Sequence, residues 1–204
     1  MNSAISLFQQ AQDLIDRESM LLQTRQFRTW LELFTKDGRY WLPVAPAQTS
    51  ARDGPAHINE ARPALDARVE RLYDPRVLPQ SPASRVSRLC GKPWLIQEAD
   101  GAIEVGVTFH VVESRPNTGG SDSQRLFAGD ATYRLERDNT ADTGLLIKCK
   151  RVDLINSESA FFGVSVLYLV AKRVLWFIFD QLFCSIEFVG NGVRVRKKVK
   201  LIKG

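Results

Sequence analysis

Apolar residues recur at helical spacing in the first part of the chain. They predict a long helix over residues 3–23 with Ser3 as its N-cap, a short helix over 26–34, and a third helix over 64–72. Residues 45–64 are rich in Pro, Gly and small polar residues and predict a long loop. The apolar residues at helical spacing are Leu7, Phe8, Ala11, Leu14, Ile15, Leu21, Leu22, Phe27, Trp30, Leu31, Phe34, Leu65, Val69 and Leu72.

Later in the chain the hydrophobic period changes to two, which is typical of β-strands with one buried face. The predicted strands are 84–89, 94–96, 103–112, 126–137 and 145–154. The last three are long and are joined by segments rich in Gly, Asn and Asp, so they predict an antiparallel meander. Helices that come first and strands that come later indicate an α+β fold.

The junction between the two patterns is a turn signal followed by a short aromatic strand. Asp37-Gly38 predicts a turn after the second helix, and residues 40–44 predict a strand in which Pro43 marks an edge or an end. Aromatic side chains of this size are buried against a partner, and a curved sheet is the natural one. We therefore expect a core that contains Trp30, Tyr40, Trp41 and Phe109.

Composition and charge exclude one class of partner. The chain has 204 residues, 44% of them hydrophobic and 25% charged, as expected for a globular protein with a sizeable core. Its net charge of +5 arises at the C-terminal end, where residues 170–204 hold eight Lys/Arg and two Asp/Glu. Residues 1–169 then hold 20 Lys/Arg and 21 Asp/Glu. Because this part has no basic excess, we expect no nucleic-acid partner.

The cysteines and the N-terminus indicate the compartment. Cys90, Cys149 and Cys184 are scattered without a CxxC pair, so neither a disulfide framework nor a zinc site is predicted. The first residues lack a basic region followed by an apolar run, so we expect no signal peptide. Both observations favour a cytoplasmic protein.

Several segments of the chain resemble one protein family. Residues 18–43 read E-x-x-L-L-x-x-R-x-F-x-x-W-L-x-L-F-x-x-D-x-x-Y-W-x-P, which resembles the opening of the small (β) subunits of aromatic-ring-hydroxylating dioxygenases. Later segments resemble successive strands of the same subunits. They read V-x-F-H-V-x-x-S-R from residue 107, F-A-G-D-A-T-Y-R-L from 127 and K-x-V-D-L-I-N from 150. The resemblance covers residues 5–169.

The resemblance implies a fold and a role in an assembly. The family has a cone-shaped, curved antiparallel sheet wrapped around N-terminal helices, as in scytalone dehydratase and ketosteroid isomerase. It implies a small-subunit trimer bound to three large (α) subunits. The large subunit would hold a Rieske [2Fe-2S] cluster and a mononuclear iron and would hydroxylate or dihydroxylate an aromatic compound. Electrons would come from a ferredoxin or reductase. This chain would carry no cofactor and no catalytic residue.

A group of arginines is the candidate interface. A family run rich in Arg is matched loosely here, where the sequence reads Asp66-Ala67-Arg68. Isolated arginines on loops are usually solvated, but clustered ones bind carboxylates across interfaces. The candidate interface residues are Arg68, Arg71, Arg85 and Arg88.

The residues also allow two other kinds of site. A mononuclear iron would need two His and a carboxylate, and the chain's two histidines are His57 and His110. A stand-alone isomerase, dehydratase or small-ligand-binding protein with the cone fold would need an open cavity, which Asp37, Tyr40, His110 and Asp130 would line. A cone filled by aromatic side chains would favour the subunit role instead.

The division of the chain is predicted as a cone domain over residues 1–169 and an atypical extension over 170–204. The extension is first apolar and then basic, and charged residues interrupt it too often for a transmembrane helix. Gly190-Asn191-Gly192 predicts a hairpin between strands 185–189 and 193–199. A packed extension, a contact with a membrane surface or the large subunit, and a translated altered reading frame remain open.

Charge reversal at the candidate interface tests this assignment. We expect Arg85→Glu and Arg88→Glu to weaken a complex with the large subunit, because arginines that bind partner carboxylates would then repel them. Size-exclusion chromatography of the co-expressed subunits measures the effect. An unchanged hexamer would contradict the interface assignment.

Overall fold

The computed structural model describes residues 6–74, 83–99, 102–115, 123–158, 184–189 and 192–197. The chain divides into two compact units, residues 1–170 and residues 171–204, and each is described by itself. The end of the predicted cone domain, residues 159–169, and most of the apolar part of the extension lie outside the described residues.

The two N-terminal helices are shorter than their sequence pattern suggests. Helix α1 spans Leu7–Gln23. Its N-cap is Ser6, whose hydroxyl accepts a hydrogen bond from the backbone N–H of Gln9. The predicted start at residue 3 with Ser3 as the cap is therefore wrong. Helix α2 spans only Phe27–Leu31. The predicted second helix is too long because Phe34 continues the helical spacing of apolar residues although it is the first residue of a strand.

The residues predicted to form a turn lie within the first strand. Strand β1 spans Phe34–Pro43 without a break at Asp37-Gly38, so the turn prediction is wrong. The pairing of β1 with strand β7 shifts register between Phe34 and Arg39, which marks a bulge at this point. A Cβ on Gly38 would lie 2.9 Å from the carbonyl oxygen of Thr35, so the bulge needs a glycine.

The predicted loop over residues 45–64 contains a strand that the sequence pattern hid. Strand β2 spans Ala56–Ala61 and pairs antiparallel with β1 at the edge of the sheet. Ile58 is its one fully buried apolar residue, which leaves too little alternation to be recognised. Helix α3 follows directly and spans Arg62–Tyr73, close to its predicted range.

Most other strands match the prediction. The order in the main sheet is β2-β1-β7-β6-β5-β3. Strand β4 stands outside this order and pairs with β5. All pairs are antiparallel except β1 with β7, which is parallel. The meander of three long strands is confirmed. The bounds are Arg85–Cys90 for β3, Trp94–Ala99 for β4, Ala102–Arg115 for β5, Ser123–Arg137 for β6 and Leu145–Leu154 for β7.

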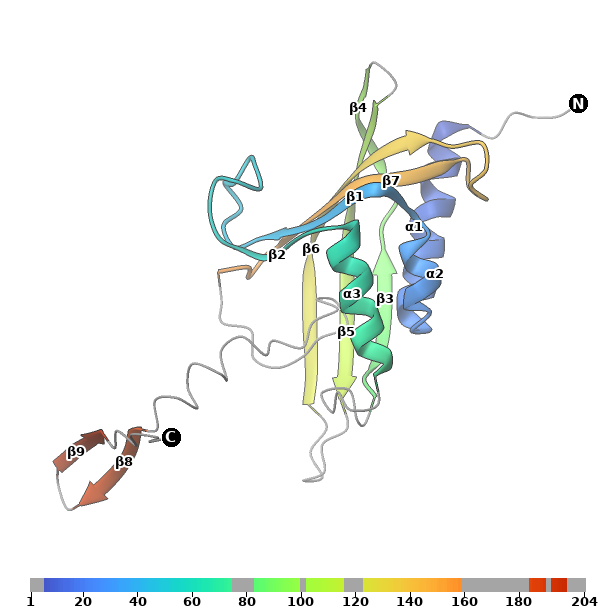
Figure 1. Cartoon of the computed structure of the whole chain (residues 1–204). Helices are drawn as coiled ribbons and strands as arrows, with labels where there is room; N and C mark the ends of the chain where they lie inside the picture. The colour runs from blue at the N-terminus through green and yellow to red at the C-terminus, as the bar shows by residue number, and fades with distance from the viewer. Residues whose placement is uncertain are drawn as a thin grey trace, which may run out of the picture. The chain divides into compact units, whose positions relative to one another are not determined.

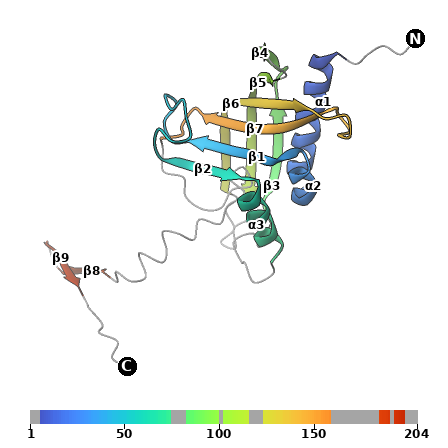
Figure 2. The ribbon, with the colours of Figure 1, turned by 45° about the horizontal axis from the view of Figure 1, so that its top comes forward.

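The sheet curves around the helices. Figures 1 and 2 show that the strands at its two edges run in clearly different directions, while α1, α2 and α3 lie along its inner side. This arrangement confirms the predicted α+β cone. The core includes Trp30, Tyr40 and Phe109 as expected. Trp41 is buried too, but it follows Tyr40 on the other face of β1 and lies under Arg151, whose guanidinium carbon is 4.5 Å from the indole centroid.

The second unit contains one described element, a hairpin. Strand β8 spans Cys184–Val189 and β9 spans Gly192–Lys197, and they pair antiparallel up to Val189 opposite Gly192. This agrees with the predicted hairpin. Within the described residues, no helix is long and apolar enough to cross a membrane.

Candidate functional site

A buried carboxylate lies inside the cone and accepts three side-chain hydrogen bonds. The indole N–H of Trp30 donates to Oε1 of Glu18 over 2.9 Å. The hydroxyl of Tyr133 and the ammonium of Lys150 donate to Oε2 over 2.6 and 2.7 Å. The side chains of Glu18 and Lys150 are 1% and 3% exposed, so this ion pair is removed from water. The four residues are called the Glu18 network below.

The Glu18 network joins four elements. Glu18 lies on the buried stripe of α1, and Trp30 is carried by α2. Tyr133 on β6 and Tyr40 on β1 both lie directly opposite Lys150 on β7, so three side chains line up across three strands. The Lys150 ammonium lies 5.0 Å from the Tyr133 ring centroid and 5.7 Å from that of Tyr40. The network therefore ties both N-terminal helices to the centre of the sheet.

A bulge explains why a lysine points into the core. The alternation Leu145, Ile147, Cys149 would place Cys149 inside and Lys150 outside. The register between β6 and β7 shifts, however: Leu135 lies opposite Ile147, and Arg134 lies opposite Cys149. The extra residue reverses which positions of β7 face inward, so Lys150 is buried.

The charges of the network fix its protonation. Burial by itself raises the pKa of the Glu18 carboxyl, but the ammonium of Lys150, the charge of Arg88 and the hydrogen bonds from Lys150 and Tyr133 hold that pKa below its ordinary value. Burial lowers the pKa of Lys150, and the charge of Glu18 opposes this shift. Burial also raises the pKa values of Tyr40 and Tyr133, so both phenols keep their protons. Glu18 is therefore a carboxylate surrounded by donors.

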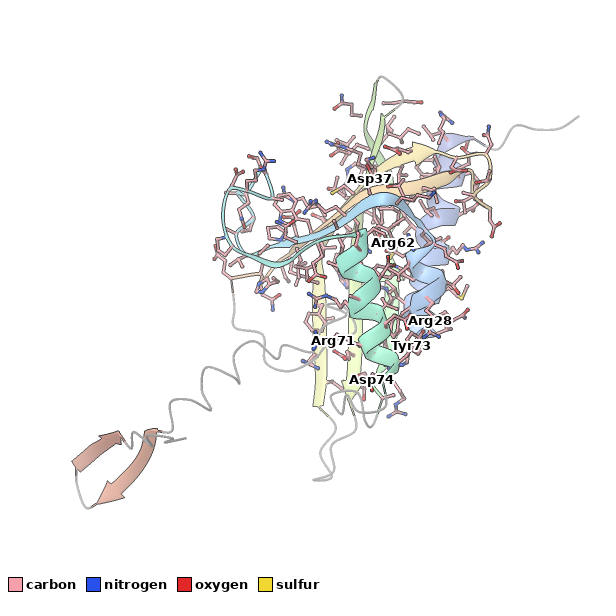
Figure 3. The ribbon with its side chains drawn as sticks, in the orientation of Figure 1. Arg28, Asp37, Arg62, Arg71, Tyr73 and Asp74 are labelled. Carbon is pink, nitrogen blue, oxygen red and sulfur yellow. The ribbon has the colours of Figure 1, made fainter. Side chains whose placement is uncertain are left out.

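This arrangement does not suit proton transfer. Three donors already bind the Glu18 carboxylate and hold its pKa below the ordinary value, whereas a general base needs a pKa near the working pH. Of the residues predicted to line a catalytic cavity, only Tyr40 faces the core. Asp37, His110 and Asp130 are exposed, and Asp37 lies on the side of β1 away from α3 (Figure 3). The predicted lining is wrong for these three residues.

The two histidines lie far apart in the sheet. His57 is on β2, where its Nε2 lies 2.6 Å from the carbonyl oxygen of Ser157, and His110 is on β5. Strands β1, β7 and β6 lie between them in the sheet order. Among the residues that the structure describes, no three His, Cys, Asp or Glu side chains gather as metal ligands.

The candidate arginines fall into two environments. Arg68 on α3 forms a bidentate ion pair with Glu60 on β2. Arg71 is exposed near the C-terminal end of α3, and Figure 3 shows it on the side of the helix opposite Tyr73. On β3, Arg85 is exposed while Arg88 is partly buried, because residues three apart on a strand lie on opposite faces. Their interface role stays a prediction, and Arg85 tests it more cleanly than Arg88.

Comparisons with known proteins identify the family. Residues 17–159 match the family described as ring hydroxylating beta subunit. The chain belongs to this family of β subunits.

Named relatives of this β subunit come from dioxygenase systems of Pseudomonas putida. The small oxygenase component of the p-cumate 2,3-dioxygenase system is 32% identical over 130 residues, which cover 63% of this chain and 69% of the relative. The β subunit of benzene 1,2-dioxygenase is 26% identical over 161 residues, which cover 71% and 83% of the two chains. The resemblance predicted from the sequence is thus confirmed.

Solved structures confirm the fold of the β subunit. The β subunit of benzoate 1,2-dioxygenase from Burkholderia mallei superimposes with a TM-score of 0.61 at 21% identity and covers 82% of this chain and 99% of its own. A naphthalene 1,2-dioxygenase structure with indole bound in its active site gives a TM-score of 0.54 at 20% identity, covering 72% and 78%.

Removing one member of the buried ion pair should destabilise the β subunit strongly. Glu18→Gln leaves the Lys150 charge without its counterion, and Lys150→Met leaves the Glu18 charge without its own. Each should lower the free energy of unfolding by about 3–5 kcal/mol, measured by urea titration. Lys148→Met, which removes an ion pair with Asp37 and Glu136 at the surface, is the matched control and should cost about 1 kcal/mol or less.

The double variant Glu18→Gln/Lys150→Met should be more stable than either single variant, because no unpaired charge then remains buried. Additive losses in this cycle would contradict a coupled ion pair.

The acid side of the stability profile should depend on Glu18. Its pKa is lower in the folded state than its ordinary value of 4.5, so below that value the unfolded protein binds more protons than the folded one. The contribution of Glu18 to the free energy of unfolding should therefore be complete above pH 4.5 and be lost as the pH falls through the folded pKa. Urea unfolding between about pH 5 and pH 3 should show a shallower loss for Glu18→Gln than for the wild type. Equal slopes would exclude Glu18 as a source of acid sensitivity.

Proposed function

We propose that this chain is the structural small subunit of a multicomponent dioxygenase that hydroxylates or dihydroxylates an aromatic compound. The main support is the Glu18 network, which lies on the inner side of the β-subunit fold. Its carboxylate already accepts hydrogen bonds from three side chains of the chain itself. A core of this kind supplies rigidity rather than a reactive group. Its rigidity suits a subunit whose outer surfaces position larger partners.

The proposed assembly contains three large and three small subunits, with the small subunits forming a trimer. The Rieske cluster and the mononuclear iron belong to the large subunit in this proposal, and a ferredoxin or reductase supplies electrons to it. Membership of the β-subunit family supports this division of labour. We propose a cytoplasmic location for the complex, where reduced electron carriers are available.

An outer face of the sheet supports the interface proposal. Arg85 and Leu89 lie on the exposed face of β3, and Val112 on β5 lies directly opposite Leu126 on β6. Leu89 and Leu126 are 70% and 61% exposed, and Val112 is exposed as well. Apolar side chains grouped on three neighbouring strands and bordered by an arginine are typical of a subunit contact. We propose this face as part of the contact with the large subunit.

Co-expression with the large subunit tests the proposed role. We expect a hexamer of three large and three small subunits by mass measurement, with all of the iron retained by the large subunit after the subunits are separated. The reason is that the small subunit contributes surface and rigidity rather than ligands.

A small subunit that stays alone in the presence of the large subunit would overturn the proposal, and so would iron that follows the small subunit. Arg134→Glu near the C-terminal end of β6 is a control charge reversal, because Arg134 is exposed and its ion pair with Glu104 is long, at 3.8 Å.

A further inference from the structure

A cavity opens where helix α2 ends beside the turn that joins strands β6 and β7. Its volume is about 250 Å³, and every residue that lines it belongs to the described part of the chain. Arg17 of α1, Glu32 directly after α2 and residues 140–143 of the turn contribute to the lining. Figures 1 and 2 show this turn next to α1. No member of the Glu18 network lines the cavity, so it is a separate feature of the fold.

The walls of the cavity are held by bonds within the chain. Asp142 in the turn pairs with Arg17, which ties the turn to α1. Within the turn, the backbone N–H of Asp138 donates to the carbonyl of Gly144 over 3.0 Å, and Gly144 has a φ of 75° that suits glycine. A preformed cavity loses little conformational freedom when it binds a group, so binding here would cost little ordering.

The polar lining of the cavity has an excess of negative charge. The carboxylates of Glu32 and Asp142 and the guanidinium of Arg17 belong to it, and two negative charges against one positive leave a net charge of −1. Because Arg17 pairs with Asp142, the remaining charge is that of Glu32. Three hydroxyls also line the cavity, and a hydroxyl can accept a hydrogen bond as well as donate one. These hydroxyls belong to Thr29, Thr140 and Thr143.

The size of the cavity limits what can bind in it. Its volume of about 250 Å³ is far above the roughly 10–15 Å³ that a single water needs, and below the about 300–1,000 Å³ of pockets for drug-sized ligands. The cavity therefore has room for one small group, such as the end of a long side chain. A metal ion is not favoured, because among the described residues no three His, Cys, Asp or Glu side chains gather as ligands.

We propose that this cavity binds an alkylguanidinium group, held by the carboxylate of Glu32. A guanidinium is planar and weakly hydrated, and its five N–H donors can be shared between a carboxylate and neighbouring hydroxyls. Its flat face suits the apolar part of the lining, which includes the core residues Leu33 and Leu145. An ammonium is more compact and more strongly hydrated, so it would fill this space less well. The proposal goes beyond the scaffold role, because it rests on the cavity and its lining.

Titration of the full chain with methylguanidinium chloride, followed by nuclear magnetic resonance, tests the site. At neutral pH and constant ionic strength, the backbone amide signals of Glu32, Leu33 and residues 140–143 should shift together and reach saturation. Methylurea has a similar shape without the charge and should shift them far less. Glu32→Gln keeps the size of the side chain and removes its charge, so it should weaken binding at least about tenfold.

Two further variants make the test specific. Glu70→Gln is the matched control, because Glu70 is an exposed glutamate of α3 that pairs with Arg28 and does not line the cavity. It should bind methylguanidinium within about twofold of the wild type. Thr29→Val removes one hydroxyl at nearly constant volume and should weaken binding about threefold. Shifts that do not saturate, that methylurea reproduces, or that persist in Glu32→Gln would overturn the proposal.

Assembly with the large subunit distinguishes the source of the guanidinium. If an arginine side chain of a partner subunit supplies it, Glu32→Gln should weaken the assembled complex at least about tenfold, whereas Glu70→Gln should not. If assembly is unchanged while methylguanidinium binds the isolated chain, the site takes a free small molecule. The titration needs only the isolated chain, so failure of this site and failure of the scaffold role give different results.

Discussion

The ion pair between Glu18 and Lys150 is the interaction on which the rest of the cone depends. Removing two opposite charges from water costs several kcal/mol for each ion, and only close contact with further hydrogen bonds offsets that cost. Here the carboxylate receives the indole N–H, the phenol and the ammonium together. These donors come from α2, β6 and β7, so the pair is stable only when all of these elements are correctly placed around α1. The network thus makes the core intolerant of alternative packings.

The inner and outer faces of the sheet have separate uses. On the inner face, Tyr40, Lys150 and Tyr133 form one transverse row that is closed by α1 and α2. On the outer face, Asp37 pairs with Lys148, and Asp130 accepts a hydrogen bond from Thr108. Asp37 and Asp130, which the sequence suggested as catalytic acids, therefore form surface interactions instead.

Sequence reasoning predicted the elements better than the site. The meander of β5, β6 and β7 was predictable because its period of two is almost unbroken, and the family segments were readable from residue identities alone. Glu18 stood in the sequence on the apolar stripe of α1, where a charged residue is a visible signal of a buried partner. Lys150 was hidden, because the bulge in β7 reverses the inward positions and no local pattern announces it. Strand β2 was hidden for a different reason: it is an edge strand, and Ile58 is its one fully buried apolar residue.

The parallel pairing of β1 with β7 sets the order in which the chain can become native. Tyr40 and Lys150 are neighbours in the sheet although more than half of the chain separates them in sequence. During synthesis, α1, α2 and β1 leave the ribosome long before the strand that completes their sheet. Until β7 arrives, the aromatic side chains of this segment have no sheet to cover them, and Glu18 has no counterion. Native contacts of such long range make folding slow, so the nascent chain must be protected from aggregation over most of its translation.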